Sequence, residues 1–158
     1  MEFLAFYAKH APDVDIFGLN SYRTPGFGDL WKTVAKAYDK PVLLTEFGTS
    51  HPKVEGDVLD EKNQADVHKK AWADIMAHAA GANPPGNAVG GFIFEWLDNW
   101  WQDGNPREHN VNPTGWNHEW NGMAGQGDGT KSPFLRQLRQ VYFVYQSLWK
   151  EKFEGPAK

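Results

Sequence analysis

The stretch PVLLTEFG, at residues 41–48, decides how this chain folds. A proline and a glycine bracket a run of branched apolar residues, and short runs of this kind are typical of buried strands. Two other stretches have the same character, DIFGLNSYR at 15–23 and GGFIFEWLDNWW at 90–101. Because their apolar residues are continuous rather than alternating, we expect a parallel sheet that is covered by helices.

Before and between these stretches, apolar residues recur at the spacing of an α-helix. We expect strands over residues 14–20, 42–48 and 89–97, and helices over 2–10, 29–39 and about 60–79. A last helix is expected to begin at Pro133, with Ser132 as its cap, after an irregular stretch over 98–131. This alternation of strands and helices predicts the α/β fold class.

Composition narrows the range of functions. The chain has 158 residues, which suits one domain, and its net charge of -4 disfavours a nucleic-acid partner. It contains no cysteine, which excludes disulfides, thiolate catalysis and cysteine-based zinc sites but leaves the cellular compartment open. No apolar run approaches the length of a membrane span, so we expect no membrane partner. The N-terminal residues lack the basic segment and cleavage site of a signal peptide.

Polar and aromatic residues close each expected strand. Asn20 and Tyr22 lie at the end of the first, Glu46 at the end of the second, and Trp96 and Asp98 at the end of the third. In parallel α/β barrels the active site lies at these carboxyl ends. Carboxylates can attack or donate protons, amides and phenols can bind hydroxyls, and an indole can stack on a sugar ring, so the pattern suits a carbohydrate ligand.

Glu46 is the strongest single indication of chemistry. It closes an apolar strand, where a carboxylate costs several kcal/mol unless it is hydrogen-bonded. Perturbed groups at strand ends favour function without proving it. Position and chemistry alone leave two interpretations open, a catalytic group and a structural ion pair with Arg23.

The three strand stretches resemble strands of the retaining glycoside hydrolases of clan A, a superfamily of (β/α)8 barrels. DIFGLNSYR resembles the sixth strand, PVLLTEFG the seventh and GGFIFEWLDNWW the eighth. Within this superfamily they resemble the barrel domain of glycoside hydrolase family 2 and related hydrolases and transglycosylases that act on β-glucans. The resemblance implies that residues 1–158 form the C-terminal portion of such a barrel, with about its last three βα units. It also implies hydrolysis or transfer of β-glycosides with retention of configuration.

The resemblance assigns roles position by position. Glu46 matches the nucleophile of the seventh strand, and Tyr22 matches the sixth-strand tyrosine that donates a hydrogen bond to it. Trp96 matches the aromatic floor of the sugar subsite, and Asn20 is a further candidate for a hydroxyl contact. For Asp98, a substrate contact and a cap of its own loop remain open.

One feature departs from the superfamily's pattern. Its acid/base glutamate follows an asparagine at the end of the fourth strand, and this sequence has no Asn-Glu pair. A retaining mechanism needs two carboxyls about 5–5.5 Å apart, and a full barrel needs about 250 residues. We therefore expect the acid/base residue to lie outside this chain. The expected partners are an oligo- or polysaccharide substrate and either the N-terminal half of the barrel or a second copy.

Three further residues are candidates for substrate contacts. Trp100 and Trp101 lie nearest the third strand end, and His51 follows the strand that carries Glu46. The spacing of the histidines and acidic residues fits no metal site, and we expect no cofactor. Two alternatives to an enzyme remain, a non-catalytic carbohydrate-binding relative that uses only the aromatic residues, and a fragment that completes a split barrel with a partner chain.

Overall fold

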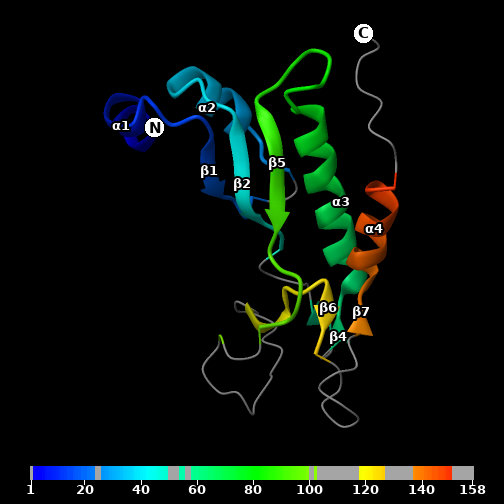
Figure 1. Cartoon of the computed structure of the whole chain (residues 1–158). Helices are drawn as coiled ribbons and strands as arrows, with labels where there is room; N and C mark the ends of the chain where they lie inside the picture. The colour runs from blue at the N-terminus through cyan, green and yellow to red at the C-terminus, as the bar shows by residue number, and fades with distance from the viewer. Residues whose placement is uncertain are drawn as a thin grey trace. The chain divides into compact units, whose positions relative to one another are not determined.

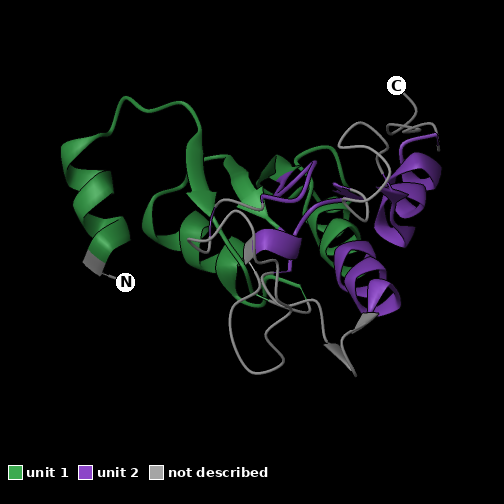
Figure 2. Ribbon diagram, turned by 90° about the horizontal axis from the view of Figure 1, so that it is seen from below, with its two compact units in different colours: residues 1–47, 70–92, 153–158 green, residues 48–69, 93–152 purple. Residues whose placement is uncertain are grey.

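A computed structural model describes residues 2–23, 26–49, 54–55, 58–99, 102, 118–126 and 137–150. These residues form two compact units, coloured separately in Figure 2. Unit 1 comprises residues 1–47, 70–92 and 153–158, and unit 2 comprises residues 48–69 and 93–152. The helices and strands, in chain order, are α1 (Glu2–His10), β1 (Phe17–Asn20), α2 (Leu30–Ala37), β2 (Val42–Phe47), β3 (Val54–Glu55), β4 (Val58–Leu59), α3 (Glu61–Ala77), β5 (Ala88–Ile93), a 3-10 turn η1 (His118–Trp120), β6 (Ala124–Gly125), β7 (Gln137–Leu138) and α4 (Gln140–Leu148).

The main sheet has three parallel strands in the order β1-β2-β5, which lie side by side in Figure 1. Helices alternate with them along the chain, so the expected α/β class is confirmed. The strands carry the core of unit 1, because Val42, Leu44 and Phe47 of β2 are fully buried. Gly91 of β5 makes this packing possible, since a Cβ there would lie 2.9 Å from the Phe47 ring.

Aromatic side chains and one carboxylate join the helices of unit 1 to its sheet. Phe27 packs edge-to-face against Trp31 of α2 and against Phe47, at centroid distances of 5.6 and 6.1 Å. Asp74 of α3 accepts hydrogen bonds from the Phe27 backbone N–H at 2.5 Å and from the Trp31 indole N–H at 3.2 Å. Tyr7 of α1 packs on Phe17, with ring centroids 5.8 Å apart.

Unit 2 is organised around α4 and the first half of α3. His68 of α3 and Tyr145 of α4 are buried together, with the histidine Nδ1 3.1 Å from the phenol oxygen. The short strands β3 and β4 pair antiparallel just before α3, and β6 pairs antiparallel with β7.

The largest difference from the sequence expectation concerns the last helix. It begins at Gln140 rather than at Pro133, because Gln137 and Leu138 pair with Gly125 and Ala124 in β7 and β6. Residues 132–136 lie outside the described residues. The third strand is also shorter than expected and ends at Ile93. Both differences arise from hydrogen bonding between segments far apart in sequence, which apolar spacing does not report.

Candidate active site

A β-bulge in β2 determines which way Glu46 points. Strands β1 and β2 pair as Phe17–Val42, Gly18–Leu43 and Leu19–Leu44, after which Asn20 pairs with Glu46. Thr45 is thus an extra residue, and bulges of this kind redirect the side chains that follow them. Regular alternation would place Glu46 on the same face as buried Leu44. Instead Phe47 takes that face, and Glu46 lies half-buried on the other side.

The carboxylate of Glu46 receives a short hydrogen bond from Tyr22. The phenol Oη donates to Oε2 at 2.6 Å. This distance lies in the range of O–H···O⁻ bonds, which are roughly twice as strong as bonds between neutral groups. Backbone bonding supports the approach, because the N–H of Ser21 donates to the carbonyl of Glu46 at 2.9 Å. The structure therefore brings together the two residues expected to be catalytic.

The ion pair between Arg23 and Glu46, left open by the sequence, is not formed in this structure. Arg23 instead binds Asp29, with Nη1 2.9 Å from Oδ1. Both side chains of this pair are largely exposed, at 58% and 78%, so it contributes little to stability. The hydrogen bond that the structure gives Glu46 is from a phenol, which holds a carboxylate in place without neutralising its charge.

Asn20 lies at the end of β1, paired with its neighbour in the bulge. The Thr45 hydroxyl donates to Asn20 Oδ1 at 2.7 Å, and both side chains are exposed. The amide N–H₂ of this exposed side chain can donate a hydrogen bond to a further group. Gly18 makes room for Thr45, because a Cβ at that position would lie 3.0 Å from the threonine methyl group.

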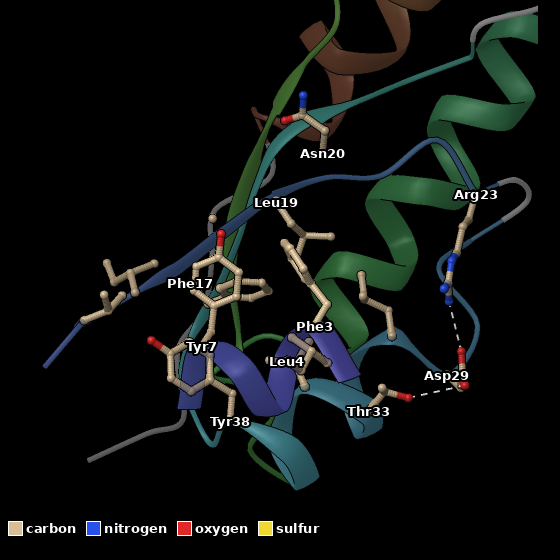
Figure 3. A pocket seen from close by; sticks show the side chains of 15 residues that line it. Phe3, Leu4, Tyr7, Phe17, Leu19, Asn20, Arg23, Asp29, Thr33 and Tyr38 are labelled. Carbon is tan, nitrogen blue, oxygen red and sulfur yellow. Dashed lines mark hydrogen bonds and ion pairs between the residues drawn. The ribbon is translucent and has the colours of Figure 1, made fainter. Parts of the chain in front are cut away.

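A separate, mostly apolar pocket of about 790 Å³ lies in unit 1 between α1, β1 and α2 (Figure 3). Phe3, Tyr7 and Tyr38 line its apolar end, and Arg23 and Asp29 lie at its polar end. Of the expected site residues, Asn20 lines this pocket, whereas Tyr22 and Glu46 are not part of its lining. The hydrogen-bonded carboxylate, rather than this pocket, is the feature that can do chemistry.

In unit 2, Trp96 follows β5 and presents its indole to solvent. Its side chain is 57% exposed, and its ring meets Tyr142 of α4 edge-on, at a centroid distance of 5.9 Å. The N–H of Ala124 donates to the carbonyl of Trp96 at 3.0 Å, which holds the backbone on which the indole stands. An exposed, backbone-anchored indole can provide an apolar platform for a sugar ring.

Asp98 lies two residues further on and is completely buried. Its two carboxylate oxygens accept hydrogen bonds from Arg139, at 2.8 and 2.5 Å, and the N–H of Gly122 donates to Oδ1 at 3.0 Å. Burial raises the pKa of Asp98 to about 6, while Arg139 and the Gly122 N–H oppose that rise. Of the two roles left open for Asp98, this geometry favours the one that organises its own loop.

Three expected contacts, Trp100, Trp101 and His51, lie outside the described residues. Among the residues that are described, no group of histidine and acidic side chains could hold a metal ion, and no helix is long and apolar enough to cross a membrane. Sequence reasoning missed Arg139. Its place in the sequence does not distinguish it from Arg136, three residues earlier, and its partner Asp98 lies 41 positions away, so no local signal could have found it.

No protein-family model matches this chain, and no curated protein sequence matches it. Solved structures do match. PfGH50B superposes with a TM-score of 0.51 at 15% identity, over 93% of this chain and 19% of that chain. A β-glucuronidase of Bifidobacterium dentium, complexed with coumarin-3-O-glucuronide, gives 0.49 at 16% identity over 93% of this chain and 22% of that chain. A GH2 β-galacturonidase from Eisenbergiella tayi, bound to galacturonate, gives 0.47 at 16% identity over 87% and 24%.

These neighbours are much longer proteins. This chain spans about a fifth of PfGH50B, with which it shares a fold. The other two neighbours are glycosidases by name, and the chain spans about a quarter or less of each.

Proposed function

We propose that this chain is the nucleophile-bearing part of a (β/α)8 glycoside hydrolase or transglycosylase that acts on β-glycosides. The observation that carries the proposal is the 2.6 Å hydrogen bond from Tyr22 to Glu46. A carboxylate at a strand end, half-buried and held by a phenol, has a position and a hydrogen-bond partner that suit a nucleophile. The fold shared with PfGH50B is consistent with this proposal and names no substrate.

The proposed reaction is a double displacement. One oxygen of Glu46 attacks the anomeric carbon, and the bond from that carbon to the leaving oxygen breaks as an acid protonates that oxygen. This gives a glycosyl ester on Glu46. The same acid, now a base, then takes a proton from water or an acceptor sugar, which attacks the anomeric carbon and releases Glu46 as a carboxylate. Through both steps the hydrogen bond from Tyr22 orients the Glu46 carboxylate toward the anomeric carbon.

The acid/base carboxyl is proposed to come from outside this chain. Either the N-terminal half of the barrel or a second copy would supply it. Trp96 is proposed as the floor of a sugar subsite, with Asn20, Trp100, Trp101 and His51 as further substrate contacts. Asp98 is proposed to act on the substrate indirectly, by fixing the loop that carries Trp96.

Covalent labelling tests the nucleophile. We expect 2,4-dinitrophenyl 2-deoxy-2-fluoro-β-glycosides of gluco and galacto configuration to leave a stable adduct on the peptide that contains Glu46, read by mass spectrometry. These reagents carry a good leaving group and so need little from the missing acid. Glu46→Gln should abolish the adduct. The matched control is Glu61→Gln, because Glu61 also accepts a hydrogen bond, from the Gln140 N–H at 3.0 Å.

An adduct on a different carboxylate, or one that persists in Glu46→Gln, would overturn the assignment. Binding of a β-glucan oligosaccharide without any adduct would instead favour the non-catalytic, carbohydrate-binding alternative.

A further inference from the structure

The segment that carries Trp96 is tied to a second segment, Asn121–Ala124, by a ladder of backbone hydrogen bonds. The N–H of Met123 donates to the Glu95 carbonyl at 2.8 Å, that of Ala124 to the Trp96 carbonyl at 3.0 Å, and that of Asp98 to the Ala124 carbonyl at 3.1 Å. This ladder fixes the backbone. It does not by itself fix the indole, which is 57% exposed.

Arg139 forms hydrogen bonds with both segments of this ladder. Its guanidinium engages both oxygens of Asp98, and its Nη1 also donates to the carbonyls of Gly122 at 2.8 Å and Trp120 at 3.0 Å. Arg139 is 4% exposed and Asp98 is 0% exposed. A planar guanidinium that meets a carboxylate through two parallel bonds permits little rotation of either group. Gly122 allows this approach, because a Cβ there would lie 2.4 Å from the Asp98 nitrogen.

The same turn of helix also contacts Trp96 directly. The N–H of Tyr142 donates to the Arg139 carbonyl at 3.0 Å, so the two residues belong to one turn at the start of α4. Tyr142 places its ring at 63° to that of Trp96, with centroids 5.9 Å apart. The turn therefore contacts the Trp96 segment at two points, at Asp98 through Arg139 and at Trp96 through Tyr142.

We propose that Arg139 is a positioning residue for Trp96. Through its paired bonds to Asp98 it fixes both the loop and the start of α4, and thereby holds the Tyr142 ring against the Trp96 indole. The consequence for sugar binding rests on the proposed function. The consequence for the orientation of Trp96 does not, so the two can be tested apart.

The orientation is tested without any sugar. The protein is labelled with 5-fluorotryptophan, and its eight tryptophans give ¹⁹F signals, of which that of Trp96 is assigned by its loss in Trp96→Phe. Arg139→Lys keeps the charge but loses the paired bonds, and we expect it to shift or split the Trp96 signal. Asp98→Asn should move the same signal. The matched control, Lys62→Met, removes the exposed ion pair between Lys62 and Asp66 and should leave the Trp96 signal in place.

Asp98→Asn also guards against misfolding. If Arg139→Lys unfolds the protein, so that all the ¹⁹F signals move to their unfolded positions, the positioning role is tested with Asp98→Asn instead. That substitution preserves the shape of the side chain and an acceptor for the Gly122 N–H. A folded variant in which the Trp96 signal keeps its position would overturn the proposal.

The role in binding is tested by a double-mutant cycle with methyl β-cellobioside. We expect Arg139→Lys to weaken binding by about tenfold, which is typical of coupling between neighbouring residues. In a Trp96→Ala background the same substitution should have no further effect. Additive effects would overturn the claim that Arg139 acts through Trp96. If the wild-type chain does not bind this sugar while Arg139→Lys still moves the ¹⁹F signal, the proposed function fails for that sugar and the positioning role stands.

Discussion

At the scale of single residues, the proposed chemistry depends on one phenol and one carboxylate. Tyr22 and Glu46 come from different strand ends and meet at 2.6 Å. Arg23, which follows Tyr22 in the sequence, forms an ion pair with Asp29 instead of Glu46. The phenol therefore holds the carboxylate in place, and Arg23 does not pair with it.

Removing the phenol should slow glycosyl-enzyme formation. We expect Tyr22→Phe to lower the rate of labelling by the 2-fluoro-glycosides by about tenfold to hundredfold, since a hydrogen bond to a charged group contributes roughly 1.5–3 kcal/mol. The measurement is the rate of adduct formation by mass spectrometry. Tyr38→Phe is the matched control, because the Tyr38 hydroxyl of unit 1 donates to the Ala11 carbonyl instead. Equal rates in Tyr22→Phe and wild type would contradict the role of Tyr22.

The contact between Gly91 and Phe47 gives a prediction for stability. In Gly91→Ala the new methyl group would lie 2.9 Å from the Phe47 ring and 3.1 Å from the Leu44 Cβ. We expect the free energy of unfolding in urea to fall by about 1–3 kcal/mol, the usual cost of overpacking. Gly125→Ala is the control. The nearest atom to its Cβ would be 3.5 Å away, so its change should stay within about 0.5 kcal/mol.

At the scale of elements, we expect the packing of α3 against α4 to make unit 2 sensitive to acid. Burial lowers the pKa of His68 to about 4, well below its ordinary value of 6.5, because the charged imidazolium would lose its hydration. A histidine with a lowered pKa binds fewer protons in the folded state than in the unfolded state. Its contribution to stability is complete above pH 6.5 and is lost as the pH falls toward 4.

This acid sensitivity can be measured by urea unfolding at pH 7.5 and 4.5. Across that interval the neutral His68 should account for a loss of about 2–3 kcal/mol in the free energy of unfolding. In His68→Asn, which can keep a bond to Tyr145, this part of the loss should disappear. The control is the exposed His10, and His10→Asn should follow the wild type. Equal pH dependence in all three proteins would show that His68 is not responsible.

The elements were predictable where local pattern decides them. The three strands of the main sheet and the first three helices lie within a few residues of their expected bounds, because apolar spacing and turn residues mark them. The meeting of Tyr22 and Glu46 was expected only through the family resemblance, since spacing does not reveal the bulge at Thr45. The Asp98–Arg139 pair joins residues 41 positions apart and has no local signature. The same is true of the pairing of β6 with β7, which delays the start of α4.

At the scale of the whole molecule, the sheet has open edges among the described residues. β1 and β5 are its outer strands, and both have exposed large apolar side chains: Ile16, just before β1, is 48% exposed, and Phe92 of β5 is 63% exposed. Parallel sheets are normally covered on both faces, and exposed apolar edges favour pairing with further strands. This exposure is what we would expect of a sheet built to continue into other strands.

We therefore expect the isolated chain to self-associate as its concentration rises. Sedimentation velocity over a range of concentrations measures this directly. Ile16→Lys, which places a charge beside β1, should shift the distribution toward the monomer. Phe143→Lys is the control, because Phe143 is similarly exposed, at 52%, but lies on α4 in unit 2. A wild-type chain that remains monomeric at all concentrations would contradict the expectation.

The bulge in β2 also bears on how chains of this kind can change in length over evolution. A strand that lacked Thr45 would read Val-Leu-Leu-Glu-Phe and could alternate regularly beside β1. The glutamate would still lie on the open face and the phenylalanine in the core. Loss or gain of one residue in a strand usually moves the side chains that follow it to the opposite face of the sheet. At the Thr45 bulge it would not, so a related chain could lack this one residue and still have the glutamate on the same face. What would change is the Asn20 amide, which would lose the hydroxyl that now holds it.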